Sequence, residues 1–237
     1  TGNHPTLRVS GNLSPMLKEP VLGAADTAGF AKVMLSDDQF KRFSASQEID
    51  FAYESPEGLR FRSNAFFQRG AIGIAMRLIP KKIRTIQELN LPEALLSFAR
   101  KSQGFFMVVG PVGQGKTTTL ASLIDVVNAE RMEHIITIED PIEYIFEPKQ
   151  SLVDQREVGI DTKDFPSALT SVFREDVDVI LVGEMREHET MAAAVTAAET
   201  GHLVFSTMHT NDAAQTVDRI IDTFTAAQQD QIRLQLA

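Results

Sequence analysis

Hydrophobic and polar residues alternate with a period of two in three segments of the first third of the chain. Such alternation is typical of strands with one buried face, and Pro-Glu-Gly and Arg-Gly turns separate the segments. The strand-like segments are 49–55, 58–67 and 71–79. Helical patterns at 27–35 and 37–45, and a strand and turn at 6–13, precede them. We therefore expect residues 1–79 to form a small α+β domain that contains an antiparallel meander.

From Gly104 onward, continuous apolar segments alternate with helical patterns. The apolar segments are 105–110, 134–140, 177–183 and 202–208, and the helical ones include 165–176, 188–201 and 211–222. Gly201 is expected to end one helix and Asn211 to cap the next. Apolar strands that alternate with helices indicate a parallel sheet covered on both faces, so the fold class is predicted to be α/β.

The segment 80–92 between these regions is charged and has proline at both ends, which is typical of a linker. A helix is expected at 92–102, with Pro92 at its start. The predicted domains are therefore an N-terminal domain at 1–79, a linker at 80–92 and a core at 93–237.

The composition of the chain argues against several classes of function. A net charge of −9 in 237 residues argues against a protein that coats duplex nucleic acid. The absence of cysteine excludes disulfides and thiolate metal sites. No apolar run reaches the ~18 residues of a membrane span, and no signal peptide is evident. Because the chain begins at Thr1 and stops within a helical pattern, we expect it to be a fragment.

A glycine-rich motif lies between an apolar strand and a helix. Gly110, Gly115, Lys116 and Thr117 match the phosphate-binding pattern G-x-x-x-x-G-K-[ST]. In this pattern main-chain amides surround the β-phosphate, the lysine reaches the β- and γ-oxygens, and the threonine hydroxyl binds Mg²⁺. The expected ATP-binding residues are Gly110, Pro111, Val112, Gly113, Gln114, Gly115, Lys116, Thr117 and Thr118. The alternative is a glycine turn beside a surface lysine.

Acidic residues follow two of the apolar strands. Glu184 follows the strand at 177–183 and can bind Mg²⁺ through water, or it is an exposed loop acid. Glu139, Asp140 and Glu143 lie at the end of the apolar segment 134–140 and just past it, where α/β sheets collect ligand groups. We expect Glu143 to activate the attacking water as general base, with Glu139 as the second candidate. Each acid taken alone also fits a surface or structural role.

Two histidines flank the strand at 202–208. His202 and His209 are predicted to lie on opposite faces, so joint metal ligation is not expected. His209 follows the strand and can contact the γ-phosphate, whereas His202 fits a hydrogen-bonded structural role equally well.

These motifs together resemble the hexameric ATPases of type IV pili and type II secretion. The resemblance rests on the phosphate loop and on "HIITIEDPIEYIF", "QREVGIDTKDF", "DVILVGEMRE" and "TAAETGHLVFSTMHTNDAAQTVDRIID". It implies a PAS-like N-terminal domain, a RecA-like core with a mostly parallel sheet, and rings with ATP between subunits. It also gives Lys116 the phosphate role, Thr117 and Glu184 the magnesium role, and Glu143 the catalytic role. In the same family, His209 and His202 form a histidine motif near the phosphate.

Within that family, "GEMR" resembles the branch that retracts type IV pili. The resemblance then implies a homo-hexamer that acts with a platform protein in the inner membrane. Its location would be cytoplasmic, at the inner face of the bacterial inner membrane. A metal cluster and a specific nucleic acid are not expected. The alternatives are a pilus assembly or type II secretion ATPase, a DNA translocase and a scaffold that binds but does not hydrolyse nucleotide. The family's C-terminal helical region is absent from the chain.

A cluster of basic residues in the first domain stands out against the acidic chain. Residues 58–84 hold seven cations and no acid. Those cations are Arg60, Arg62, Arg69, Arg77, Lys81, Lys82 and Arg84. One interpretation is a solvated face; the other is that Arg62 and Arg77 stabilise a γ-phosphate held by a neighbouring subunit. The family's interfacial arginines lie in the same region.

Overall fold

The computed structural model describes residues 1–236 and divides into two compact units, Thr1–Ile79 and the chain from Pro80 onward. Within residues 1–236, no helix combines the length and the apolar character that crossing a bilayer requires.

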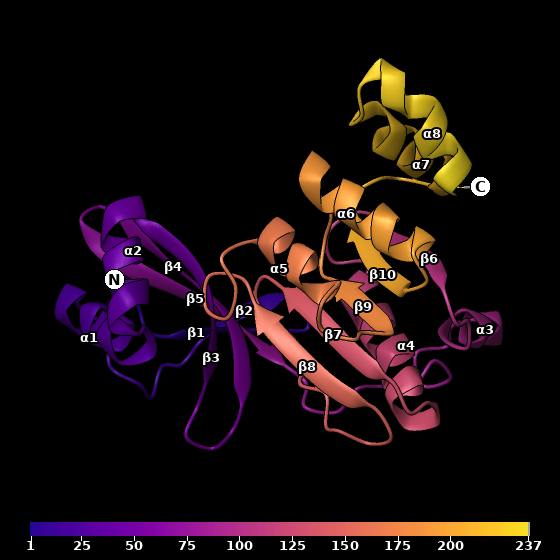
Figure 1. Ribbon diagram of the computed structural model, residues 1–237. Helices are drawn as coiled ribbons and strands as arrows, with labels where there is room; N and C mark the ends of the chain where they lie inside the picture. The colour runs from indigo at the N-terminus through magenta and orange to yellow at the C-terminus, as the bar shows by residue number, and fades with distance from the viewer. Residues whose placement is uncertain (237) are drawn as a thin grey trace. The chain divides into compact units, whose positions relative to one another are not determined.

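The first unit has the predicted α+β character (Figure 1). A hairpin of β1 (Thr6–Val9) and β2 (Asn12–Pro15) is followed by α1 (Ala24–Met34) and α2 (Asp37–Ser46). The antiparallel meander then comprises β3 (Glu48–Glu54), β4 (Arg60–Gln68) and β5 (Ala71–Ile79). Both helices pack on the meander around Ala31, Phe43, Phe51 and Ala65, each with 1% exposure or less. The expected meander is confirmed.

The second unit contains a five-stranded sheet in the order β6-β10-β9-β7-β8, and every neighbouring pair is parallel. Its strands are β6 (Gly104–Val109), β7 (His134–Glu139), β8 (Leu152–Glu157), β9 (Val179–Val182) and β10 (Leu203–Met208). Its helices are α3 (Leu96–Ala99), α4 (Lys116–Glu130), α5 (Phe165–Val172), α6 (His188–Glu199), α7 (Ala213–Asp222) and α8 (Ala226–Leu236). The predicted α/β class with a parallel sheet is confirmed.

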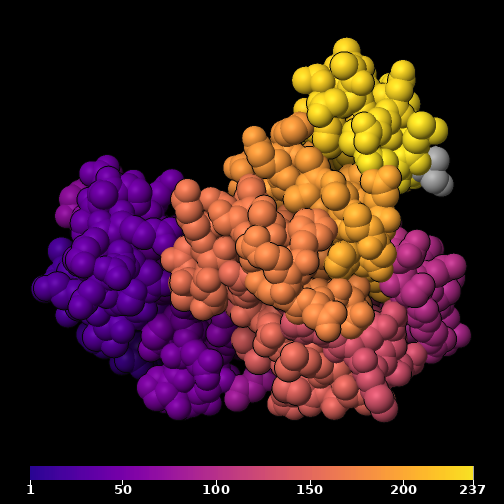
Figure 2. Space-filling view, in the orientation of Figure 1, coloured from indigo at the N-terminus to yellow at the C-terminus, as the bar shows by residue number. Residues whose placement is uncertain are grey.

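Both faces of this sheet are covered because its strands are apolar on both sides. Ile136 and Ile138 pack with α5 and α6, whereas Ile135 packs with α4 and Phe205 on the other face. This alternation follows from the two-residue period of a strand. The C-terminal helix α8, yellow in Figure 2, lies beside α6, and Gln235 donates a hydrogen bond to Glu199.

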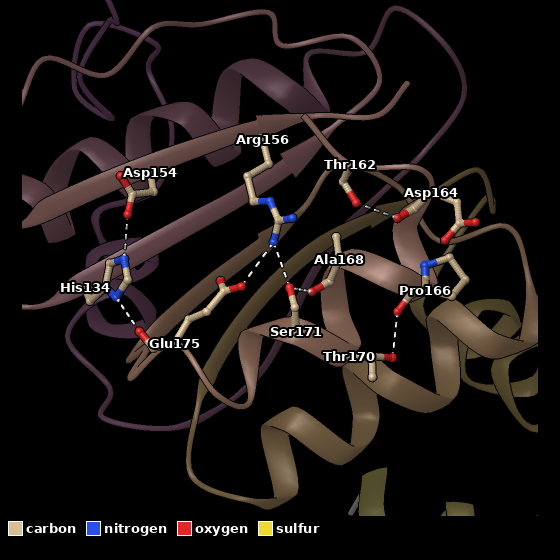
Figure 3. Close-up of polar contacts among 10 residues, drawn as sticks. All are labelled: His134, Asp154, Arg156, Thr162, Asp164, Pro166, Ala168, Thr170, Ser171 and Glu175. Atoms are coloured by element: carbon tan, nitrogen blue, oxygen red, sulfur yellow. Dashed lines mark hydrogen bonds and ion pairs between the residues drawn. The ribbon is translucent and has the colours of Figure 1, made fainter. Parts of the chain in front are cut away.

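Strand β8 forms an edge of the sheet and was not predicted, because its sequence "LVDQRE" lacks a continuous apolar run. Two of its side chains bind elements on the α5 side of the sheet (Figure 3). Asp154 pairs with His134 at 3.0 Å, and the Arg156 Nη1 donates to Ser171 Oγ at 2.8 Å. These polar contacts add to the main-chain pairing of β8 with β7.

The segment expected to be a linker, 80–92, is part of the second unit and packs within it. Ile86 is fully buried in the cluster that contains Leu123 and Ile124 of α4, and the Ser122 hydroxyl donates to the carbonyl of Arg84. The helix expected at 92–102 consists of a 3-10 turn, Glu93–Leu95, and the short α3. The apolar residue Ile86 indicates that this segment packs into the core, although its overall composition is charged.

The N-terminus of α7 differs from the prediction by one residue. Asp212, not Asn211, is the N-cap, and its carboxylate accepts a hydrogen bond at 2.8 Å from the main-chain N–H of Gln215. Both residue types cap helices well, so the sequence alone does not separate them.

Candidate nucleotide site

The glycine-rich loop connects the end of β6 to the start of α4, as its motif requires. Gly113 and Gly115 have φ values of +81° and +87°, in the left-handed region that residues with a Cβ rarely adopt. Helix α4 is 15 residues long and begins directly after Gly115, so the positive end of its dipole faces the loop. Within the loop, Pro111, Val112 and Gln114 are exposed.

Lys116 is buried to 8% exposure in the first turn of α4. Its ammonium group donates to the carbonyl oxygens of Gly110 at 2.7 Å and Pro111 at 2.9 Å. It also lies 3.2 Å from Nδ1 of His209. Burial lowers the pKa of Lys116, and the negative charge of Glu184 partly opposes that shift. The lysine is therefore held inside the loop by acceptors that phosphate oxygens could replace.

Glu184 follows β9 and lies beside His209, which follows β10. The Glu184 Oε2 is 3.5 Å from the His209 Nε2, and its Oε1 is 2.8 Å from Arg186. A Cβ on Gly183 would come within 3.3 Å of the carbonyl oxygen of Ile138, so glycine lets β9 approach β7 closely before Glu184. Lys116, Glu184 and His209 thus meet at the carboxyl edge of the sheet. Arg186 belongs to the "GEMR" segment that contributes to the family resemblance, but the sequence pattern predicted no individual role for it.

A cavity of about 180 Å³ lies at the same edge of the sheet. Its lining includes Asp140, Asp164, Glu184 and Arg186. Ligands of open α/β sheets bind outside the carboxyl ends of the strands, which is where this cavity lies.

The two candidate bases have different surroundings. Glu139 is 5% exposed, and its Oε1 accepts hydrogen bonds from Thr137 at 2.7 Å and Gln155 at 3.3 Å. Burial raises the pKa of Glu139 to about 7, although these hydrogen bonds oppose the rise. Glu143 is half-buried in the following loop, and its main-chain N–H donates to the Glu139 carboxylate. Glu143 is the more accessible of the two, which suits a group that must meet water.

The threonines of the motif lie in the first turn of α4 and are half-buried. The Thr118 Oγ1 is 3.1 Å from the hydroxyl of Tyr144. A contact therefore connects the phosphate loop to the loop that carries Glu143. Tyr144 is a further residue that sequence analysis did not single out.

The placement of His202 corrects the expectation that it lies near the phosphate. His202 precedes β10, whereas His209 and the phosphate loop lie at the strand's other end. Six residues of strand span about 20 Å, so His202 cannot reach the same anion within one subunit. Its Nδ1 is 2.9 Å from the carbonyl oxygen of Ala197, which fits the structural alternative.

Arg62 and Arg77 lie directly opposite each other in the β4–β5 register of the first unit. Arg62 is half-buried and Arg77 is exposed. Like charges in directly opposed positions repel.

No group of three or more His, Cys, Asp or Glu side chains within residues 1–236 is arranged to hold a metal ion. The carboxylate of Glu184 and the hydroxyl of Thr117 are oxygen donors of the kind that Mg²⁺ prefers.

A glycine-rich loop between a parallel strand and a helix, with a buried lysine and acids at the same sheet edge, defines a P-loop nucleoside triphosphatase. Comparisons with known proteins define the family further. The profile of the type II/IV secretion system protein family matches residues 7–236, so the chain belongs to that family.

Its relatives include proteins of pilus retraction. The chain is 44% identical to the type IV pilus retraction ATPase PilT of Pseudomonas aeruginosa over 100% of its own length and 68% of that protein. It is 43% identical to a twitching motility protein of Neisseria gonorrhoeae, over 98% of its own length and 62% of that protein. A crystal structure of the pilus retraction motor PilT with bound ADP superposes with a TM-score of 0.93 at 45% identity. That match covers 99% of this chain and 68% of the other.

The chain thus spans about two thirds of the length of these relatives. It carries the ATPase core of a protein similar to PilT, and the RecA-like expectation for the second unit is confirmed.

Proposed function

We propose that the chain is the ATP-hydrolysing part of a motor that drives retraction of type IV pili. The observation that carries the proposal is the full-length similarity to PilT together with the buried Lys116 and the glycine-rich loop. The ADP bound to the related PilT supports a nucleotide in the same loop here.

The loop and α4 bind the phosphates of ATP. Lys116 exchanges its bonds to the carbonyl groups of Gly110 and Pro111 for bonds to β- and γ-phosphate oxygens. Loop amides and the α4 N-terminus add further positive potential. His209, beside Lys116 and Glu184, is close enough to respond to the γ-phosphate.

Thr117 and Glu184 would hold Mg²⁺. A bound Mg²⁺ neutralises charge that develops on the phosphate oxygens. Glu184 lies beside Lys116 and His209, so the residues present fit such an ion at the phosphate edge.

Glu143 acts as the general base that orients and activates water. Glu139 is less suited to this role because its carboxylate is buried and already accepts hydrogen bonds from Thr137, Gln155 and Glu143. Such a buried acid supports the loop that follows it.

The working assembly is a homo-hexameric ring in which Arg62 and Arg77 of one subunit stabilise the γ-phosphate held by the next. The motor acts with a platform protein in the inner membrane, and its place is the cytoplasmic face of that membrane. The similarity to PilT supports these proposals.

ATP hydrolysis by the complete protein and by Lys116→Ala tests the enzymatic part. We expect magnesium-dependent phosphate release by the parent and its loss in the variant. Deletion of the gene in its host tests the direction of work. Excess pili support retraction, whereas bald cells would assign the protein to pilus assembly.

A further inference from the structure

The loop that carries Glu143 receives hydrogen bonds from two side chains of the edge strand β8. We propose that Gln155 and Glu157 are positioning residues that hold the main chain on both sides of Glu143 for hydrolysis. The proposal rests on the general-base role assigned to Glu143 under the proposed function.

Glu157 fixes the residue before Glu143. Its Oε2 accepts a hydrogen bond from the main-chain N–H of Ile142 at 3.0 Å. Glu157 is 5% exposed and Ile142 is 6% exposed, so water does not compete freely for this bond.

Gln155 fixes the residues after Glu143 with both ends of its amide. The Nε2 donates to the carbonyl oxygen of Tyr144 at 2.8 Å, and the Oε1 accepts from the N–H of Phe146 at 2.8 Å. The same Nε2 lies 3.3 Å from the Oε1 of Glu139.

The three bonded positions leave little freedom between them. Ile142 is held by Glu157, the N–H of Glu143 by Glu139, and Tyr144 by Gln155. Gln155 and Glu157 are two residues apart on β8, so both point to one face of the strand. Asp154 and Arg156, which alternate with them along the strand, point to the opposite face. There they contact His134 and Ser171 (Figure 3).

The held loop also contacts the phosphate-binding helix. The Tyr144 hydroxyl lies 3.1 Å from the Thr118 Oγ1, one residue after Thr117. This contact helps to fix the position of Glu143 relative to the phosphate loop. A general base must be placed accurately, since a shift of ~1 Å can lower a rate by about a hundredfold.

Steady-state ATP hydrolysis and ADP affinity of the complete protein test the proposal. Gln155→Met keeps the length of the side chain and removes its hydrogen bonds. We expect kcat to fall by about ten- to a hundredfold, with ADP affinity unchanged within about twofold because the phosphate loop is intact. Asp154→Asn, on the opposite face of the same strand, is the matched control; its amide oxygen can still accept a hydrogen bond from His134, so it should keep the parent kcat.

A rescue pair separates hydrogen bonding from packing at the second position. Glu157→Gln keeps an acceptor for the Ile142 amide and should retain most of kcat, whereas Glu157→Met should lose it to a similar extent as Gln155→Met. Equal kcat in the two Glu157 variants, or the parent kcat in Gln155→Met, would overturn the proposal.

Two further measurements keep the outcomes distinct. Glu143→Gln should abolish turnover; if it does not, the base role under the proposed function fails. If only the β8 variants keep the parent kcat, the positioning role fails alone. Should the methionine variants not fold, amide exchange of the parent decides. The main-chain amides of Ile142 and Phe146 should be protected from exchange. Exchange as fast as in an open loop would contradict the positioning role of Gln155 and Glu157.

Discussion

Among single residues, Glu139 combines an acidic group with nearly complete burial. Its pKa is raised from 4.5 to about 7, so the folded protein retains a proton that the unfolded chain releases between these values. The stabilisation contributed by this group is therefore greatest below pH ~4.5, and it is lost as the pH rises through about 7.

Glu139→Gln removes the ionisation and keeps an acceptor for Thr137. Relative to the parent, we expect this variant to gain stability between pH 5 and pH 8, because only the parent must then bury a charge. Thermal unfolding at both pH values measures the difference. Glu147→Gln, an exposed acid in the following loop, serves as the control. A difference that shrinks as the pH rises would contradict the assigned direction.

Gly113 has a positive φ and no atom within 4 Å of an added Cβ, so its constraint is purely conformational. Gly113→Ala should strain the phosphate loop by about 1–2 kcal/mol. Because the exposed free loop can relax and must return to the strained conformation to bind ADP, we expect a ~5- to 30-fold loss of ADP affinity. Titration with ADP measures this loss. Gly29→Ala, in the interior of α1 with equally open space, should leave ADP affinity unchanged. Equal effects of both changes would mean that backbone conformation is not the cause.

At the scale of elements, the cap of α7 offers a direct comparison between neighbours. Asp212→Ala removes the acceptor for the Gln215 N–H and should lower the free energy of unfolding by about 1 kcal/mol. Asn211→Ala should cost much less, because Asn211 is not the cap. Denaturant unfolding of the two variants tests this order, and a reversed order would restore the sequence-based assignment.

The elements also show which signals a sequence contains. The strands that lie inside the sheet are mostly apolar, and Val179–Val182 and Leu203–Met208 fall within their predicted segments. Strand β8 was missed because half of "LVDQRE" is charged, and an edge strand needs fewer apolar positions. Gln155 and Glu157 were missed with it. Their roles depend on the register that places Glu157 opposite Glu139, which no local pattern encodes.

The residues of the candidate site also fall into those that a sequence motif predicts and those that only the fold reveals. Lys116 and Glu184 were predicted because a phosphate loop and a parallel sheet fix where such residues must lie. The sequence left His202 open between a structural role and the phosphate role implied by the family. Strand β10 separates it from His209, which favours the structural role. The contact between Tyr144 and Thr118 joins segments 26 residues apart, so only the folded chain reveals it.

At the scale of the whole molecule, the proposed ring makes a prediction about Arg62 and Arg77. If these arginines act on a neighbour's nucleotide, Arg62→Ala/Arg77→Ala and Lys116→Ala are defective on opposite sides of the subunit interface. Each protein alone should be inactive in ATP hydrolysis. In rings mixed at equal ratio, about a quarter of the interfaces pair an intact phosphate loop with intact arginines.

Hydrolysis should therefore recover to about a quarter of the parent rate when the two variants are co-assembled, if the sites turn over independently. Phosphate release before and after mixing measures the recovery. No recovery, from variants that still form mixed rings, would mean that the arginines and the lysine serve the same subunit. Full activity of the arginine variant alone would remove both arginines from catalysis.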